Sequence, residues 1–178
     1  LGSEFSETQI KTFLDSVGAE YKHMEKQEIL DKTVNDLSEG KAIGWFQGRM
    51  EFGPRALGSR SILGDPRSDK MQKNLNLKVK YRESFRPFAP SILENEVNNW
   101  FKMSVKSPYM LLVSEIKDDK KIEMNDAEKN LFGIDKLNIK RSEIPAVTHV
   151  DYSARIQTVS KKTNQRYYDL ISKFKEIT

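Results

Sequence analysis

Three arginines and three glycines interleave in a short stretch of the chain, and this combination is typical of anion-binding loops. The residues are Gly48, Arg49, Gly53, Arg55, Gly58 and Arg60. Glycine permits a positive φ and a close approach to a ligand, so successive backbone N–H groups can point at phosphate oxygens. Arginine adds a planar, permanently charged fork of donors that fits phosphate or carboxylate through two parallel bonds. The stretch predicts a site for a phosphate or a carboxylate.

A second basic cluster follows about twenty residues later. It contains Lys78, Lys80, Arg82 and Arg86, is punctuated by Tyr81, Phe85 and Phe88, and carries Pro87 and Pro90 at its end. We expect the two clusters to converge on one polyanion.

A structural interpretation stands beside this one. Arginines and glycines in loops are often solvated turn residues, and Glu51 and Glu83 could simply neutralise their neighbours. Lys78 and Lys80 alternate with apolar residues, so a half-exposed strand there would turn both lysines toward solvent.

A third group of chemically active side chains lies near the end of the chain. His149, Asp151, Ser153 and Arg155 have the same parity, so they would share one face if residues 147–159 formed a continuous strand. Nothing in the sequence marks Ser153 as a nucleophile, and a His–Asp pair is more often structural than catalytic. Since His23 and His149 are the only histidines and cysteine is absent, the sequence indicates no metal site.

Short apolar-periodic segments must position these groups, and they predict an α/β protein. Helices are expected at 8–17, 26–37, 68–77 (capped by Ser68), 94–101 and 165–175 (capped by Asn164, with Tyr168, Ile171 and Phe174 inward), and strands at 42–46, 91–93, 109–113 and 154–159. Trp100 and Phe101 read as core residues. The charged segment 115–143 predicts a solvated excursion.

Length and composition bound the possible functions. With 178 residues, 31% of them charged, the chain predicts one globular domain. No apolar run approaches the roughly 20 residues that cross a bilayer, and no secretion signal is visible, so no membrane association and a cytoplasmic location are expected. The net charge of +4 favours anionic partners, but the spread of lysines among 26 acidic residues argues against nucleic acid as the main one. Residues 1–5 look vector-derived, which leaves 6–178 as the domain.

Three long motifs carry a resemblance to a known family. Gly48–Leu63, Arg82–Ser91 and Pro145–Val159 resemble, in this order, the C-terminal domain of carbamoyltransferases related to the nodulation protein NodU and to the antibiotic O-carbamoyltransferases. The similarity covers nearly all of the chain after about two dozen residues.

The resemblance implies a single YrdC-like domain, a twisted mixed β-sheet flanked by helices. Such a domain uses ATP with Mg²⁺ and carbamoyl phosphate to form carbamoyl adenylate and pyrophosphate. An N-terminal Kae1-like domain, absent here, holds iron or another metal and passes the carbamoyl group to an acceptor hydroxyl. The family also implies a further strand and an Asn-Thr-Ser-Phe-Asn-like site segment after Thr178, so we expect a domain that is incomplete at its C-terminus.

The resemblance also assigns residues. Arg55, Lys80, Arg86 and Arg155 are expected to bind carbamoyl phosphate, the adenylate or the ATP phosphates, followed in rank by Arg49, Arg60, His149 and Asp151. Many relatives have a small residue such as glycine where this chain has Tyr152, which would narrow the pocket. A non-catalytic module that binds nucleotide or RNA is the alternative function.

Overall fold

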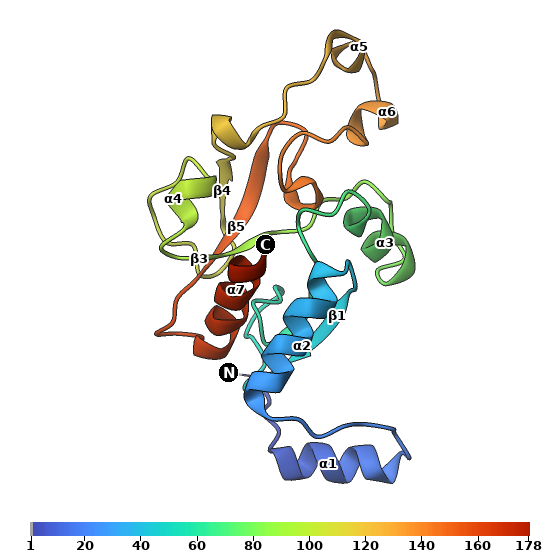
Figure 1. Ribbon diagram of the computed structural model, residues 1–178, viewed down its shortest axis with the longest axis vertical. Helices are drawn as coiled ribbons and strands as arrows, with labels where there is room; N and C mark the ends of the chain where they lie inside the picture. Colours follow the sequence, from blue (N-terminus) through green and yellow to red (C-terminus); the bar gives the residue numbers. More distant parts are fainter. Residues whose placement is uncertain (1) are drawn as a thin grey trace.

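The fold is organised around β5 (Ser153–Val159), the central strand of a three-stranded sheet. The computed structural model, shown in Figure 1, describes residues 2–178. β5 pairs in parallel with β3 (Ser91–Leu93) and antiparallel with β4 (Leu112–Glu115). A separate antiparallel pair is formed by β1 (Ile43–Phe46) and β2 (Arg60–Leu63). The structure confirms a small α/β domain with a mixed sheet, and it divides the strands between two sheets.

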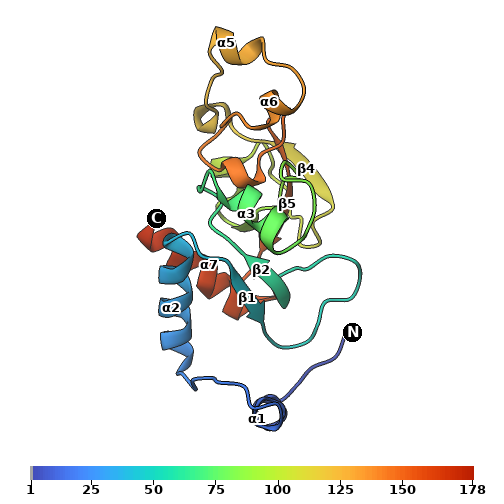
Figure 2. The same cartoon turned by 90° about the vertical axis from the view of Figure 1, so that its right-hand side faces the viewer.

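Helices and short helical turns connect these strands. They are α1 (Glu7–Ser16), α2 (Lys26–Ser38), α3 (Met71–Lys78), α4 (Val97–Trp100), η1 (Asp118–Lys120), α5 (Asp126–Lys129), α6 (Ile134–Leu137), η2 (Pro145–Val147) and α7 (Gln165–Ile177). α2 and α7 pack side by side. α1 and the α5–α6 excursion lie at opposite ends of the molecule in both views (Figures 1 and 2). No helix within residues 2–178 has the length and apolar character needed to cross a membrane.

The two larger hydrophobic clusters hold most of the elements together, and a smaller third one joins α3 to η2 through Met71, Leu75 and Ala146. The first forms on the face of β5 that carries Ala154 and Ile156, where Phe101 and Ile116 are almost fully buried. The second lies between α2 and α7 and includes Trp45 of β1. Each large buried side chain contributes about 1.5–3 kcal/mol through loss of apolar contact with water. Because β5 contributes to both clusters, through Ile156 and Val159 respectively, it links the two packed regions.

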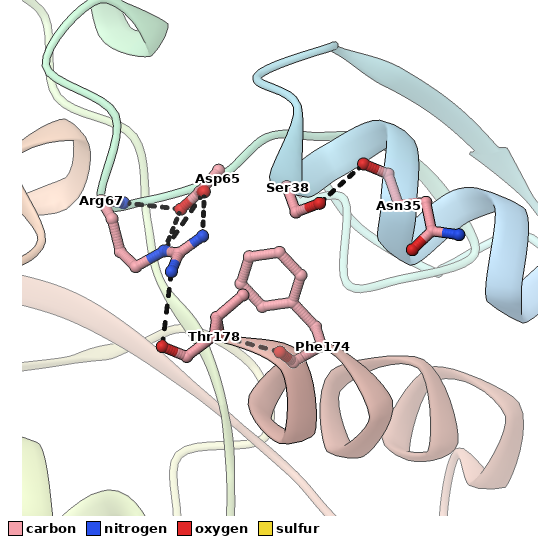
Figure 3. A network of polar contacts seen from close by, with 6 residues as sticks. All are labelled: Asn35, Ser38, Asp65, Arg67, Phe174 and Thr178. Carbon is pink, nitrogen blue, oxygen red and sulfur yellow. Dashed lines mark hydrogen bonds and ion pairs between the residues drawn. The ribbon is translucent and has the colours of Figure 1, made fainter.

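A polar network fastens the end of α7 to the turn after β2, as Figure 3 shows. The buried carboxylate of Asp65 accepts hydrogen bonds from the backbone N–H of Arg67 at 2.9 Å and from Arg67 Nη2 at 2.7 Å. Arg67 Nη1 also donates to the carbonyl oxygen of Thr178 at 3.4 Å, and its guanidinium lies over the Phe174 ring. The charge pair is mostly covered, so it orients this turn against α7.

Expected helix caps met different outcomes. Asn164 caps α7 as predicted, because its side chain accepts a hydrogen bond from the Tyr167 N–H at 3.2 Å. The predicted Ser68 cap is wrong: α3 begins at Met71, and Lys70 precedes it without a side-chain cap. Ser68 instead belongs to the preceding turn, where its N–H donates to the Asp65 carbonyl. The helix expected at 94–101 is shorter, since α4 begins only at Val97.

The buried strand expected at 109–113 is also wrong. β4 begins at Leu112 because Met110 adopts a φ of 55°, which breaks the extended backbone before it. Its neighbours are not covered: Tyr109 is 66% exposed, Leu111 75% and Val113 58%. β4 is an edge strand, so apolar residues there need not be buried. The strand at 42–46 buries only Trp45 fully.

The middle of the charged segment 115–143 is exposed, as predicted, whereas Ile116, Arg141 and Ser142 near its ends are buried. Its short helices α5 and α6 bury no side chain, and Phe132 between them is 92% exposed.

Candidate functional site

The loop between β1 and β2, residues 47–59, lies against the polar face of β5. Gln157 Nε2 donates a hydrogen bond to the carbonyl of Leu57 at 2.8 Å, and Ser91 Oγ of β3 donates to Gln157 Oε1 at 2.8 Å. The first bond joins residues 100 positions apart and the second joins residues 66 positions apart. The strand alternation therefore places Ser153, Arg155 and Gln157 on the face that the loop approaches.

The three glycines of the loop adopt the positive φ angles that the sequence pattern predicted. Gly48 has φ 48°, Gly53 has φ 115° and Gly58 has φ 102°. Gly58 also packs so closely on the Tyr167 ring of α7 that a Cβ there would lie 2.4 Å from it. Both the positive φ and the close contact require glycine at position 58.

A carboxylate of the protein itself fills the backbone nest in this loop. Glu51 Oε1 accepts hydrogen bonds from the N–H groups of Leu57 at 2.7 Å, Ser59 at 2.7 Å and Arg60 at 3.1 Å. Partial burial opposes ionisation of Glu51, but these bonds outweigh it and hold the pKa of Glu51 below its ordinary value. The nest that the sequence predicted for phosphate thus binds Glu51 here.

Two predicted site residues, Arg55 of the loop and Arg155 of β5, lie within electrostatic range of each other. Burial lowers the pKa of Arg155, and the positive charge of Arg55 lowers it further. Arg155 Nε is buried and has no hydrogen-bond partner among residues 2–178. Two guanidiniums that repel each other favour an anion between them.

His149 and Asp151 join Arg155 through a turn, so residues 147–159 do not form the continuous strand that a shared face would require, although β5 matches the strand predicted at 154–159. The N–H of His149 donates to the Ser153 carbonyl at 2.8 Å, and the N–H of Tyr152 donates to the His149 carbonyl at 3.1 Å. Tyr152 adopts φ 63°, a conformation that glycine reaches without strain, which gives a backbone reason for the small residue expected here. The chain reverses before β5, so His149 and Asp151 lie outside the strand and their parity does not place them on its face.

Hydrogen bonds connect the members of this turn. His149 Nδ1 lies 3.0 Å from Ser153 Oγ, and the Ser153 N–H donates to Asp151 Oδ1 at 3.0 Å. Burial lowers the pKa of His149, Asp151 partly raises it, and the charge of Arg155 lowers it again. His149 is therefore neutral at pH 7. The bonds from Ser153 lower the pKa of Asp151, which stays ionised.

Arg60 and Arg49 have partners elsewhere. Arg60 Nη1 donates to the carbonyls of Gln47 and Ser59, both at 2.9 Å, and Nη2 donates to those of Gly48 at 3.0 Å and Ser3 at 3.2 Å. Its guanidinium also lies 3.4 Å from the centre of the Phe46 ring. Arg49 Nε pairs with Glu4 at 3.2 Å on the surface. The structure does not bring these two arginines to the Arg55–Arg155 pair.

The first residues pack against the loop rather than lying apart from it. The carbonyl of Ser3 accepts the Met50 N–H at 2.9 Å, and the rings of Phe5 and Phe46 are 6.2 Å apart. A vector origin for residues 1–5 stays a prediction; Leu1 lies outside the described residues.

The second basic cluster is about as exposed as the first, since each contains exposed cations and one partly buried arginine, Arg60 in the first and Arg82 in the second. Lys80 and Arg86 follow α3, which ends at Lys78, so the alternative of a strand at this point is wrong. Lys80 is exposed, and Arg86 Nη2 pairs with Glu83 at 3.0 Å with about half of each side chain exposed. Arg82 instead bonds Asn76 Oδ1 at 2.7 Å and lies over Phe88.

Two cavities flank these groups. One of about 390 Å³ has mostly apolar walls, with Ala56 and Lys80 among its lining residues. The other, of about 510 Å³, lies between α3 and the 148–151 turn and includes His149, Asp151, Lys73 and Lys140 in its lining. Of the predicted residues, Lys80 lines the first cavity and His149 and Asp151 line the second, whereas Arg49, Arg60 and Arg86 line neither.

No group of three or more histidine, aspartate or glutamate side chains suited to a metal ion occurs within residues 2–178. Sequence reasoning did not assign Glu51 or Gln157 to the site. An acidic residue inside a glycine-rich loop, where backbone donors need an acceptor, was the available signal for Glu51.

Comparison with known proteins identifies the family. Residues 34–178 match the family described as Carbamoyltransferase C-terminus. An uncharacterised protein of Synechocystis sp. is 51% identical over the whole chain, which covers 29% of that protein. Nodulation protein NolO of Bradyrhizobium diazoefficiens is 42% identical over 85% of the chain and 24% of its own length. The 3'-hydroxymethylcephem-O-carbamoyltransferase of Streptomyces clavuligerus is 35% identical over 78% of the chain and 22% of its own length. The chain spans less than a third of these relatives, and it belongs to the carbamoyltransferase C-terminal family.

Proposed function

We propose that this domain binds Mg-ATP and carbamoyl phosphate and forms carbamoyl adenylate, with release of pyrophosphate. A partner domain of Kae1-like type within the longer protein then transfers the carbamoyl group to the hydroxyl of an acceptor molecule. Family membership supports carbamoyl transfer as the reaction class.

The observation that carries the proposal is the Arg55–Arg155 pair. The positive charge of Arg55 on the loop disfavours the charged form of Arg155 on β5, and Arg155 Nε is buried without a hydrogen-bond partner among residues 2–178. Such an arrangement costs free energy in the absence of a ligand and regains it when an anion binds. It suits a substrate with several negative charges.

The chemistry of the step explains why this charge is needed. Carbamoyl phosphate must first lose its phosphoryl group to water, which releases inorganic phosphate and leaves carbamate. Carbamate is a poor electrophile until its oxygen is joined to the α-phosphate of ATP. That joining breaks the bond between the α- and β-phosphates, and negative charge accumulates on the departing pyrophosphate. Fixed cations stabilise this charge as it develops. Arg55 and Arg155 would contact the phosphates, while Lys80 and Arg86 would attract the polyanion from the exposed side.

His149 and Asp151 would complete the site at the start of β5. At pH 7 the imidazole is neutral, and Nδ1 is engaged with Ser153, so Nε2 remains to accept or donate one hydrogen bond. Asp151 holds the Ser153 N–H and so fixes the turn. We assign both residues to ligand orientation.

Calorimetric titration with Mg-ATP, with and without carbamoyl phosphate, tests the proposal. Arg55→Ala and Arg155→Ala should each weaken ATP binding by about 1.5–3 kcal/mol, the value of a charged hydrogen bond. Lys129→Ala is the matched control, since it removes one positive charge on α5, at the far end of the molecule (Figure 1). The Lys129→Ala variant should bind Mg-ATP with the same affinity as the unaltered chain.

Turnover is followed as carbamoyl-phosphate-dependent release of pyrophosphate from ATP. If both this chain and the longer protein bind ATP saturably but release no pyrophosphate, the adenylate step is refuted. The domain would then be a nucleotide-binding module without this activity. Absence of ATP binding in both forms would refute the site itself.

A further inference from the structure

The loop that carries Arg55 is held by a single carboxylate. Glu51 Oε1 accepts three backbone N–H groups, from Leu57, Ser59 and Arg60, at 2.7–3.1 Å. One acceptor oxygen thereby closes the chain from residue 51 to residue 60, with Arg55 inside the closed segment. Few other contacts restrain the middle of this segment, because a Cβ at Gly53 would meet nothing within 4 Å.

The C-terminal end of the closed segment is attached to the rest of the domain. Next to the Glu51 bonds, the Leu57 carbonyl accepts Gln157 Nε2 from β5 at 2.8 Å. Gly58 lies against the Tyr167 ring, and Arg60 continues into β2. Arg55 is close enough to β5 for its charge to act on Arg155, and its position depends on the shape that Glu51 imposes on the segment.

We propose that Glu51 is a positioning residue whose carboxylate shapes the 51–60 loop so that Arg55 faces Arg155. This inference rests on the proposed function for its consequence in ligand binding. In this proposal Glu51 makes no contact with the phosphates. Its carboxylate binds the backbone N–H groups of the loop, and it affects the ligand only through the position of Arg55.

The carboxylate is better suited to this role than a neutral acceptor. Three donors converge on one oxygen, and a negatively charged acceptor forms stronger and shorter bonds with N–H groups. A glutamine keeps the oxygen but loses the charge, so it should retain part of the function. An alanine removes the acceptor and leaves three N–H groups without a partner, which the loop can remedy only by changing shape.

Nuclear magnetic resonance of the ligand-free chain tests the structural half of the inference. The Gln157 side-chain amide reports the docking of the loop on β5, and the backbone amides of Leu57, Ser59 and Arg60 report the Glu51 bonds. On acidification these three amides should shift together as Glu51 takes up a proton, at a pH below the ordinary value of about 4.3 for glutamate. In Glu51→Gln this dependence should vanish while Gln157 stays close to its native position. In Glu51→Ala the Gln157 signal should move to that of a solvated amide.

Calorimetry with Mg-ATP tests the functional half. Glu51→Ala should weaken binding about tenfold and Glu51→Gln about threefold, since partial rescue by the isosteric variant is expected of a positioning role. Glu123→Gln, which neutralises an exposed carboxylate of the excursion, is the matched control and should not change affinity. Urea unfolding of each variant confirms that the domain is folded.

The outcomes separate the two proposals. If the unaltered chain and its longer form bind no ATP, the proposed function fails, yet the Gln157 signal still decides whether Glu51 shapes the loop. If Arg55→Ala weakens ATP binding while Glu51→Ala does not, or if the Gln157 signal is native in Glu51→Ala, the positioning role of Glu51 is refuted. If Glu51→Ala does not fold, Glu51→Gln decides: amides that still titrate together in that variant refute the role.

Discussion

The 47–59 loop and the 79–90 segment contain the same kinds of residue, but the fold uses their cations differently. In the loop, Gln157 and Tyr167 anchor the backbone, and Arg55 lies near another arginine. In the 79–90 segment, Lys80 is exposed and Arg86 pairs with Glu83. Composition alone treats the two regions as equivalent basic clusters. Their difference is that the loop is attached to β5 and α7 just after Arg55, so Arg55, although its side chain is exposed, stays near the like charge of Arg155.

The same distinction holds within the loop itself. Arg55 and Arg60 are five residues apart, but Arg60 donates to four backbone carbonyls and stacks on Phe46. Arg60 therefore holds β1 and the preceding residues together. An arginine whose donors are already satisfied by the protein is poorly available for a ligand.

The largest effect is expected from a substitution that disrupts the packing of the loop on α7. Gly58→Ala should lower the free energy of unfolding by about 2–4 kcal/mol, since a Cβ meets the Tyr167 ring at 2.4 Å and φ is 102°. Urea denaturation measures it. Gly44→Ala in β1, where a Cβ meets nothing within 4 Å, should change stability by less than about 0.5 kcal/mol. Equal effects in the two variants would mean that the loop is not packed as described.

The second prediction is that replacing Arg55 changes ATP affinity and the free energy of unfolding in opposite directions. Arg55→Ala should slightly raise the unfolding free energy of the ligand-free chain, by less than about 1 kcal/mol, because it removes a like charge from beside Arg155. The same variant should weaken ATP binding. A double-mutant cycle with Arg155→Ala, measured by calorimetry, should give non-additive losses, since both residues serve one anion. Strict additivity would place the two arginines on separate ligand groups.

A smaller effect is expected in the 79–90 segment. Lys80→Ala and Arg86→Ala should each weaken ATP binding by less than about 1 kcal/mol, and the loss should shrink as salt is raised, because exposed charges are screened. Titrations at low and high ionic strength measure this. A salt-independent loss as large as that of Arg55→Ala would remove the contrast between the two regions.

The smallest effect concerns His149. Its pKa in the folded chain lies below the ordinary value of about 6.5, so the unfolded chain binds more protons in the window between the two values. Stability therefore rises with pH through that window and is lost as pH falls into it. Arg155→Ala should raise the pKa of His149, which imidazole resonances would record. A fall, or no change, would place Arg155 away from the imidazole.

Much of the fold could be predicted because its main helices and its central strand have strong local signals. The spacing of Tyr168, Ile171 and Phe174 after Asn164 predicted α7, and these side chains do pack against the core between α2 and α7. β2 was missed because Arg60–Leu63 continues an arginine- and glycine-rich stretch, and its pairing with β1 is not local. The apolar composition of residues 109–113 predicted a buried strand, but β4 lies at the edge of its sheet, where apolar residues can stay exposed.

The candidate site was only partly accessible from sequence. Motif resemblance named Arg55 and Arg155, but their proximity arises from a loop docking on a strand far along the chain, which no periodicity reports. The parity of His149 and Arg155 suggested proximity for an incorrect reason, since a turn with Tyr152 at φ 63° intervenes. The satisfied donors of Arg60 and the nest around Glu51 depend on backbone conformation, which residue types do not reveal.

The position of β5 has a consequence for hydrogen–deuterium exchange. β5 is bonded on both sides and contributes to both hydrophobic clusters, so its amides should exchange only when the whole domain opens. The exposed middle of the 47–59 loop should exchange through small local openings instead. The site thus joins the slowest-exchanging strand to one of the fastest-exchanging loops. An anion that bridges Arg155 and Arg55 would slow exchange in the loop and leave β5 unchanged.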